Sequence, residues 1–121
     1  MKTAAAIAFT GLALLAAPVF AHHAEPLYDE KNPITVTGVV ARVEWSNPHA
    51  YLYLDVKNAE GGVEQWAVEL RSPNSLKHNG WTSATLRVGD AVVCTGGRSR
   101  SGGKAMRAAT IVMPDGRKLK S

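Results

Sequence analysis

Apolar and polar residues alternate with a period of two along most of the chain after residue 33. From Tyr51 to Lys57, for example, Leu52, Leu54 and Val56 share one face of an extended chain. Such alternation is typical of β-strands that bury one face in a core and turn the other toward solvent. The pattern predicts five strands, which span residues 34–45, 51–57, 63–70, 86–96 and 105–113.

The first of these segments changes its apolar parity at a glycine. Ile34 and Val36 fall on one parity, Val39 and Val43 fall on the other, and Gly38 lies between the two pairs. A glycine at such a switch favours a β-bulge, which bends a long strand so that both halves face one core. We therefore expect a bend at Gly38.

A short helix is predicted between the third and fourth strands. Ser72 is a favourable N-cap, Pro73 suits the first helical position, and Gly80 ends the segment after barely two turns. Five strands, a bent first strand and a helix in this place match the order of elements in an OB-fold, a small Greek-key barrel. We therefore predict an all-β, five-stranded, OB-fold-like barrel. An SH3-like barrel and a β-sandwich are alternatives that the bend and the helix position disfavour.

The segment before the strands has a different pattern. Lys2 precedes an apolar run over residues 4–17, and the run ends in PVFA, with small residues at the positions that signal peptidase reads. This layout predicts a signal peptide over residues 1–21 and therefore a periplasmic or secreted protein. An uncleaved membrane anchor is the alternative, but the stretch is interrupted and barely long enough to span about 30 Å of hydrocarbon.

Cleavage after Ala21 leaves residues 22–121, which suffice for one small domain and are too few for two. Apolar residues make up 45% of the chain, as in globular proteins. Loss of Lys2 lowers the formal net charge from +4 to +3, which is too little to predict nucleic-acid binding. Cys94 is the single cysteine, so no internal disulfide is available, and its apolar strand predicts a small buried side chain.

The stretch Trp45-Ser46-Asn47-Pro48-His49 carries the most distinctive polar residues. Interpreted as a turn, Asn47 and Pro48 fix the backbone, and His49 is an ordinary residue at the start of a strand. Interpreted as a site, a histidine beside a rigid proline at the mouth of a barrel is well placed to bind a metal ion. The spacing alone favours the turn.

Short motifs of aromatic, histidine and turn residues are spread over nearly the whole mature chain. They are His22-His23, Tyr28-Asp29, Trp45 to His49, Trp66 with Glu69, Ser72-Pro73-Asn74, Gly80-Trp81, Val88-Gly89-Asp90 and Pro114 to Arg117. Together they resemble a family of small secreted or periplasmic bacterial proteins of unknown function. The resemblance implies export and a β-barrel but no established activity. Relatives usually carry Ser-Phe after the paired histidines, where this chain has Ala24-Glu25.

The resemblance includes His22, His23 and His49 in the family's motifs and leaves His78 outside them. A mature N-terminal histidine can chelate copper through its α-amino nitrogen and ring Nδ1. A second imidazole, from His49, completes a T-shaped set of three nitrogens that suits Cu(II). Because the terminal amine must lose its proton, the copper affinity is expected to fall as the pH drops below about 7.7–8.0.

The candidate metal site therefore comprises His22, His23, His49 and Glu69, with copper as the cofactor. Glu69 or Tyr28 is expected to approach as a weak axial ligand or as an outer partner of a ligand. Zinc is an alternative metal, but the usual Cys and His spacings of zinc sites are absent. Frayed terminal histidines that bind metals weakly are a further alternative.

We interpret the protein as a binding protein and not an enzyme, because no nucleophile motif, phosphate loop or paired-carboxylate signature is found. The alternative to metal binding is a module for an anionic glycan or a protein partner in the cell envelope. Outward Tyr51 and Tyr53, with Arg98 and Arg100 near the last hairpin, would form its aromatic and basic face. No nucleic-acid partner and no integral membrane segment are expected after cleavage.

Overall fold

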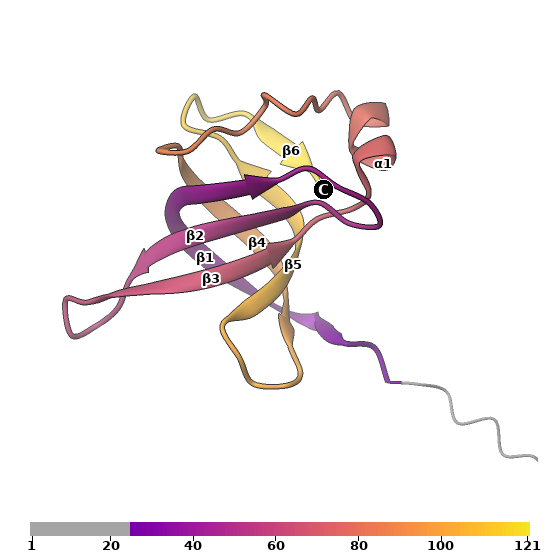
Figure 1. The fold of residues 1–121 in the computed structure, drawn as a ribbon. Helices are drawn as coiled ribbons and strands as arrows, with labels where there is room; N and C mark the ends of the chain where they lie inside the picture. The colour runs from indigo at the N-terminus through magenta and orange to yellow at the C-terminus, as the bar shows by residue number, and fades with distance from the viewer. Residues whose placement is uncertain (1–24) are drawn as a thin grey trace, which may run out of the picture.

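A computed structural model describes residues 25–121, which form six β-strands and one short α-helix (Figure 1). The elements in chain order are β1 (Tyr28–Glu44), β2 (Tyr51–Lys57), β3 (Val63–Glu69), α1 (Pro73–His78), β4 (Ala91–Ser99), β5 (Ala105–Val112) and β6 (Lys118–Lys120). The predicted signal peptide, its cleavage site, His22 and His23 lie outside the described residues.

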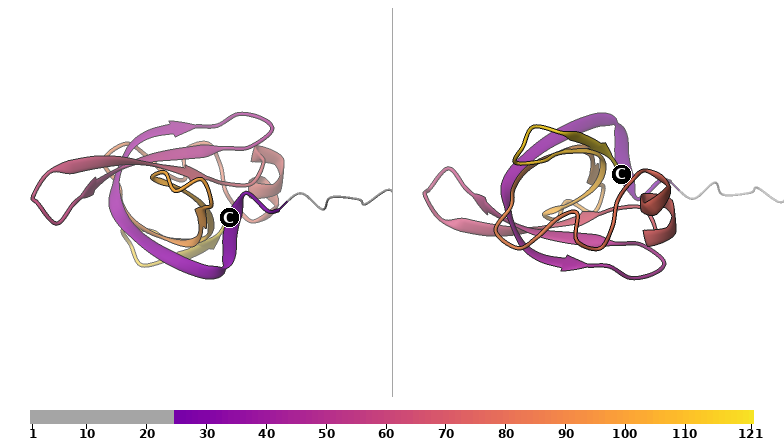
Figure 2. Two further views of the ribbon diagram at one scale, coloured as in Figure 1. Left: turned by 90° about the horizontal axis from the view of Figure 1, so that it is seen from below. Right: turned by 90° about the horizontal axis from the view of Figure 1, so that it is seen from above.

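The strands form one sheet that closes on itself. Its order is β3-β2-β1-β4-β5-β6, with antiparallel neighbours, and an additional parallel pairing of β3 with β5 closes a five-stranded ring. Figure 2 shows this ring from its two ends. The all-β, OB-fold-like architecture is therefore confirmed. The sixth strand, β6, was not predicted, because its Lys-Leu-Lys sequence is strongly polar and pairs with the edge of β5.

The predicted second and third strands and the helix agree closely with the structure. Ser72 caps α1 as expected, since its Oγ accepts a hydrogen bond from the Ser75 backbone N–H at 3.2 Å. The first strand, however, begins at Tyr28 instead of residue 34. The polar beginning of β1 pairs with the end of β4. If Gly97 of β4 carried a side chain, its Cβ would lie only 2.9 Å from the Asp29 carbonyl carbon. Glycine at this position therefore lets the beginning of β1 cross close to β4.

The bend expected at Gly38 occurs farther along β1. Val36 and Val40 are both buried, whereas Val39 is 43% exposed, so the inward parity continues through Gly38. The pairing of β1 with β2 shifts between Val40 and Arg42, and this irregularity brings the later residues to the core side. A Cβ at Gly38 would lie 2.7 Å from the Asp55 carbonyl oxygen, so this glycine serves a close approach of two strands.

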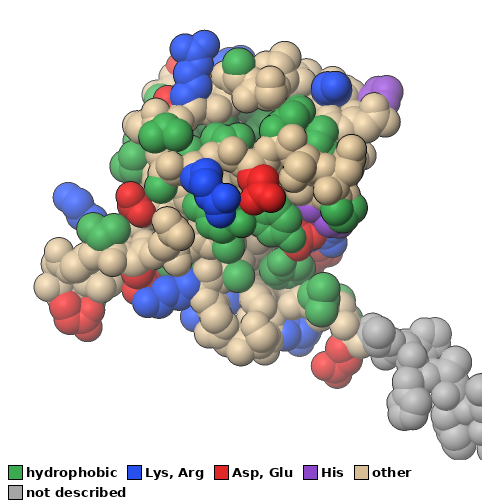
Figure 3. Space-filling view, in the orientation of Figure 1, with side chains coloured by type: hydrophobic (Ala, Val, Ile, Leu, Met, Phe, Trp, Pro, Cys, Tyr) green, Lys and Arg blue, Asp and Glu red, His purple; other side chains and the backbone are tan. Residues whose placement is uncertain are grey.

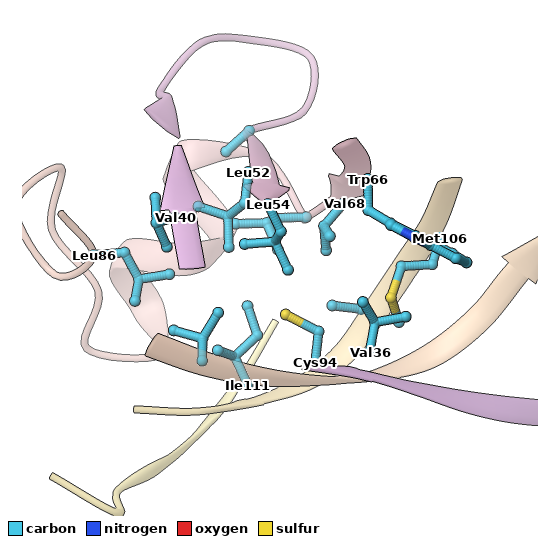
Figure 4. Packing of buried hydrophobic residues seen from close by; sticks show 14 of the residues in the cluster. Val36, Val40, Leu52, Leu54, Trp66, Val68, Leu86, Cys94, Met106 and Ile111 are labelled. Atoms are coloured by element: carbon cyan, nitrogen blue, oxygen red, sulfur yellow. The ribbon is translucent and has the colours of Figure 1, made fainter. Parts of the chain in front are cut away.

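The core fills the inside of the ring with side chains from every strand of the barrel (Figure 4). Leu52 and Leu54 from β2, and Ile111 from β5, are completely buried. Cys94 is also completely buried, as predicted for a small apolar side chain, and burial raises the pKa of its thiol to about 12. A thiol in this state is a weak nucleophile and a weak metal ligand at neutral pH.

On the face shown in Figure 3, basic and acidic side chains are interspersed. Apolar side chains gather around a hollow in the upper part of this view. Among residues 25–121, no helix has the length and apolar character needed to cross a membrane.

Candidate functional site

A polar cluster lies at the seam where β3 and β5 close the barrel. Glu69 at the end of β3 is the register partner of Arg107 on β5. The loop before β2 is tied to the same end of β3, because the Leu70 N–H donates to the Ala50 carbonyl and the Ala50 N–H donates to the Arg71 carbonyl. Segments that are distant in the sequence therefore converge on this seam.

Glu69 is the centre of the cluster, and only 7% of its surface is exposed. Its Oε2 accepts hydrogen bonds from the hydroxyl groups of Tyr28 at 2.6 Å and Tyr51 at 3.2 Å. Its Oε1 lies 3.5 Å from Nη2 of Arg107 and 3.5 Å from Nδ1 of His49. A buried carboxylate is costly unless it is paired and hydrogen-bonded, and this one has four partners.

The alternation of β3 explains why Glu69 lies at this seam. Val68 points into the core and is completely buried, so Glu69 points to the outer face of the barrel. On that face it would be solvated, but Tyr28 from the start of β1 and Tyr51 from β2 lie against it. The burial of Glu69 is therefore produced by polar neighbours and not by the core.

The electrostatics of the cluster keep both tyrosines protonated. Burial and the hydrogen bond to Glu69 raise the pKa of Tyr28 well above its usual value. Burial and the nearby negative charge of Glu69 also raise the pKa of Tyr51. Both hydroxyl groups therefore act as hydrogen-bond donors to the carboxylate over the physiological pH range.

His49 is held by the backbone as well as by this carboxylate. Its Nδ1 lies 3.1 Å from the Leu70 carbonyl oxygen, and its side chain is 35% exposed. A carbonyl oxygen can only accept a hydrogen bond, so Nδ1 carries the proton and donates it. In the neutral ring the lone pair is then on Nε2, which is the atom available to bind a metal ion.

A cleft of about 270 Å³ lies over the cluster. Its lining combines the polar cluster with the first part of the described chain. The lining residues are Pro26, Leu27, Tyr28, Glu30, His49, Glu69 and Arg107. The chain that leads back to the predicted N-terminal histidines therefore enters the described structure at this cleft.

The described residues do not make a metal site by themselves. Within residues 25–121, no three side chains of His, Cys, Asp or Glu lie close enough together to hold a metal ion. His49 and Glu69 lie close together, and Glu69 approaches the Nδ1 side of His49. Further ligands would have to come from outside this range, where His22 and His23 lie.

The residues predicted for a glycan-binding face are only partly brought together. Tyr51 and Tyr53 lie side by side on β2, with ring centroids 6.4 Å apart and planes inclined by 25°. Arg98 lies over the Trp66 ring at 5.5 Å.

The other arginine of this predicted face is held elsewhere. Arg100 forms an ion pair with Asp29 at 3.4 Å. Among the described residues, no hydrogen bond or cation–π contact joins either Arg98 or Arg100 to the tyrosine pair. The aromatic and basic parts of the predicted face are therefore not joined by direct contact.

Arg107 is a member of the cluster that the sequence analysis did not single out, and its pairing with Glu69 was missed. Met106 and Ala108 on either side of it are buried, so its outward direction follows from the alternation. Its partner follows only from the parallel register of β3 and β5. The pairing of β3 with β5 that closes the barrel is a property of the OB-fold. Aligning the sequences of these two strands in that topology would have indicated that Arg107 lies opposite Glu69.

Comparison with solved structures supports the fold assignment. The chain is similar to a crystal structure of mitochondrial single-stranded DNA-binding proteins from S. cerevisiae, Rim1, with a TM-score of 0.53 and 7% sequence identity. The match covers 68% of this chain and 92% of that chain. At this identity the likeness shows the fold alone, since one fold carries many functions.

Comparison by sequence assigns the family. No curated protein matches the chain. A family model described as a family of unknown function matches residues 8–107, which include the polar cluster and most of the barrel. The chain therefore belongs to this family of unknown function, DUF6152.

Proposed function

We propose that the protein is an exported copper-binding protein in which the mature N-terminal His22 and His49 hold Cu(II). The observation that carries the proposal is the hydrogen bond from His49 Nδ1 to the Leu70 carbonyl oxygen. It fixes the ring and leaves Nε2 as the metal-binding atom. A metal-binding histidine usually donates its other ring N–H to a carbonyl or a carboxylate, and His49 has both next to Nδ1.

The path of the chain supports the contribution of His22. Pro26 and Leu27 line the same cleft as His49. His22 is four positions before Pro26, and an extended chain covers roughly 3.3–3.6 Å per residue, so four residues reach roughly 13 Å. The cleft has a volume of about 270 Å³ and is lined by both Pro26 and His49, so a segment of this length can extend from Pro26 into it. The α-amino nitrogen and Nδ1 of His22 then supply two ligands, and Nε2 of His49 supplies the third.

In this proposal Glu69 positions His49 instead of binding the metal. Its Oε1 faces Nδ1, the protonated nitrogen of His49, so it stabilises the orientation and tautomer of the ring. The tyrosine hydroxyl groups and Arg107 in turn hold the carboxylate in place. Copper bound here would be available for storage or transfer, and we assign the chain no catalytic step.

The experiment compares two proteins that differ only at the N-terminus. One begins at His22 with a free α-amine, and in the other this amine is acetylated. We expect the first to bind Cu(II) more than about 100-fold more tightly in calorimetric titrations, because acetylation removes the amine nitrogen from the chelate ring. This loss exceeds the roughly 10–100-fold cost of removing an outer partner of a ligand. Equal affinities would overturn the proposal.

Residue-specific variants separate His49 from the other histidine of the described chain. His49→Ala should weaken Cu(II) binding strongly in the protein that begins at His22. His78→Ala, at the exposed end of α1, is the matched control and should bind as the parent does. Equal losses in the two variants would indicate unspecific binding to surface imidazoles.

A second candidate function is binding of a glycan in the cell envelope, and the neighbouring rings of Tyr51 and Tyr53 favour it. Neighbouring tyrosine rings are a suitable platform for sugar rings. Arg42 already lies over the Tyr53 ring at 3.9 Å, so this face would have to open for stacking. Arg98→Ala and Arg100→Ala together should weaken retention on an anionic glycan column if this function holds, and unchanged retention would contradict it.

A further inference from the structure

A second and larger cavity adjoins the cleft over Glu69. Its volume is about 560 Å³, and it shares Glu30 and Arg107 with the cleft. The other lining residues are Arg71, Ala108, Ala109 and Ser121. A volume of this size is typical of small-molecule sites. The copper proposal makes no use of it.

The cavity has more hydrogen-bond donors than its acidic side chain can satisfy. Arg71 is exposed, and no carboxylate of residues 25–121 lies within ion-pair distance of it. Arg107 is shared between Glu69 at 3.5 Å and Glu30 at 3.8 Å, which are both long ion pairs. A guanidinium group offers five N–H donors in a planar fork.

Ser121 supplies a further donor on the wall of this cavity. The residue is 5% exposed, and its Oγ is buried without a hydrogen-bond partner among the described residues. Glu30 is the single acidic side chain of the lining, and 66% of it is exposed, so solvent screens its charge. The wall of the cavity therefore combines two guanidinium groups, one buried hydroxyl group and one exposed carboxylate side chain.

We propose that this cavity binds an oxyanion group, a carboxylate or a phosphate, of a small organic molecule. Arg71 and Arg107 provide the charge, and their forks suit the planar oxygen pair of a carboxylate or the oxygens of a phosphate. The side chains of Ala108 and Ala109 are short, so the cavity has room for the rest of the molecule. This site is separate from the copper ligands and does not depend on the N-terminal histidines.

Two probes distinguish the two oxyanions. Citrate and inorganic phosphate are titrated separately into the full mature protein at low ionic strength, and binding is followed by calorimetry and by NMR of the arginine Nε–H groups. We expect one or both probes to bind and to shift the Arg71 Nε–H signal. Binding of citrate alone assigns the site to carboxylates, and binding of phosphate assigns it to phosphate groups. Failure of both probes to bind at millimolar concentration would overturn the proposal.

A pair of variants with the same change of charge tests the location. Arg71→Gln should weaken the binding of the probe at least about tenfold, since a charge-assisted contact is lost. Arg87→Gln removes a charge from an exposed position in the turn before β4 and should leave the affinity unchanged. Equal weakening in both variants would show that net charge alone attracts the anion, and it would overturn the proposal. Copper binding should stay unchanged in Arg71→Gln.

Discussion

Val68 and Glu69 are neighbours on β3 and are buried to nearly the same extent, with exposed fractions of 0% and 7%. Val68 is buried by a core whose contacts are apolar and have no required direction. Glu69 is buried by four polar side chains from four segments, and each contact has a required geometry. The barrel interior thus provides stability, whereas the polar cluster provides a defined orientation for His49.

The largest effect on stability is expected from the interior. Leu54→Ala removes a completely buried side chain from β2 and should lower the free energy of unfolding by about 2–5 kcal/mol. The measurement is urea-induced unfolding, with Val88→Ala as a control at a position that is 71% exposed. The folded fraction of Leu54→Ala should still bind copper with parental affinity. A loss no larger than that of the control would contradict the assignment of Leu54 to the core.

In the polar cluster, by contrast, a substitution is expected to affect copper binding as well as stability. Glu69→Gln keeps the shape but removes the charge, so the free energy of unfolding should fall by about 1.5–3 kcal/mol. The same variant should weaken Cu(II) binding roughly 10–100-fold, because His49 loses the carboxylate next to Nδ1. Both quantities are measured on one preparation, by unfolding and by titration.

Glu64→Gln is the matched control on the same strand. Glu64 pairs with Lys104 at 2.6 Å and accepts a hydrogen bond from the Trp66 ring, and it does not line the cleft. Its copper affinity should equal that of the parent. If the two glutamate variants bind copper equally well, Glu69 has no positioning role.

A smaller effect on stability is expected from removing a tyrosine hydroxyl group. Its size should depend on how deeply the carboxylate that accepts the hydrogen bond is buried. Tyr28→Phe removes a 2.6 Å hydrogen bond to the buried Glu69, and the free energy of unfolding should fall by about 1–2 kcal/mol. Tyr53→Phe removes a 3.3 Å hydrogen bond to Glu44, whose side chain is 43% exposed, and should cost less than about 0.5 kcal/mol. Equal losses in urea unfolding would contradict the special burial of Glu69.

The smallest effect is a pH dependence in the alkaline range. The pKa of Tyr28 is raised in the folded state by burial and by Glu69, so the folded protein holds this proton more tightly than the unfolded chain does. Its contribution to stability is complete below the unfolded pKa of about 10 and is lost as the pH rises above that value. Unfolding measured between about pH 9 and 11 should therefore show a steeper loss of stability in the parent than in Tyr28→Phe. Parallel curves would contradict this.

The regular part of the fold was predictable because its signals are local. The alternation in β2 and β3 and the Ser72-Pro73 pair gave the right strands and helix. The early start of β1 was not predictable from its polar residues 28–33, since it is stabilised by pairing with β4. The bulge was predicted at Gly38, but it lies near Ala41. In the sequence, a glycine that lets two strands approach closely cannot be distinguished from one that allows a bend.

The candidate site was predictable only in its residue types. The sequence singled out His49 and Glu69, but their relative placement depends on how the loop before β2 meets the end of β3. Arg107 joins them through the parallel register that closes the barrel, which is a long-range pairing without a local signal. The cavity beside Arg71 was missed for the same reason.

The most direct test of the account is pulsed EPR of the Cu(II) complex of the protein that begins at His22. The remote ring nitrogen of each coordinating imidazole gives a characteristic modulation. We predict two coordinating imidazoles in the parent and one in His49→Ala, with both retained in His78→Ala. A spectrum of the His49→Ala complex identical to that of the parent would contradict the central claim that the seam of the barrel holds His49 ready to bind copper.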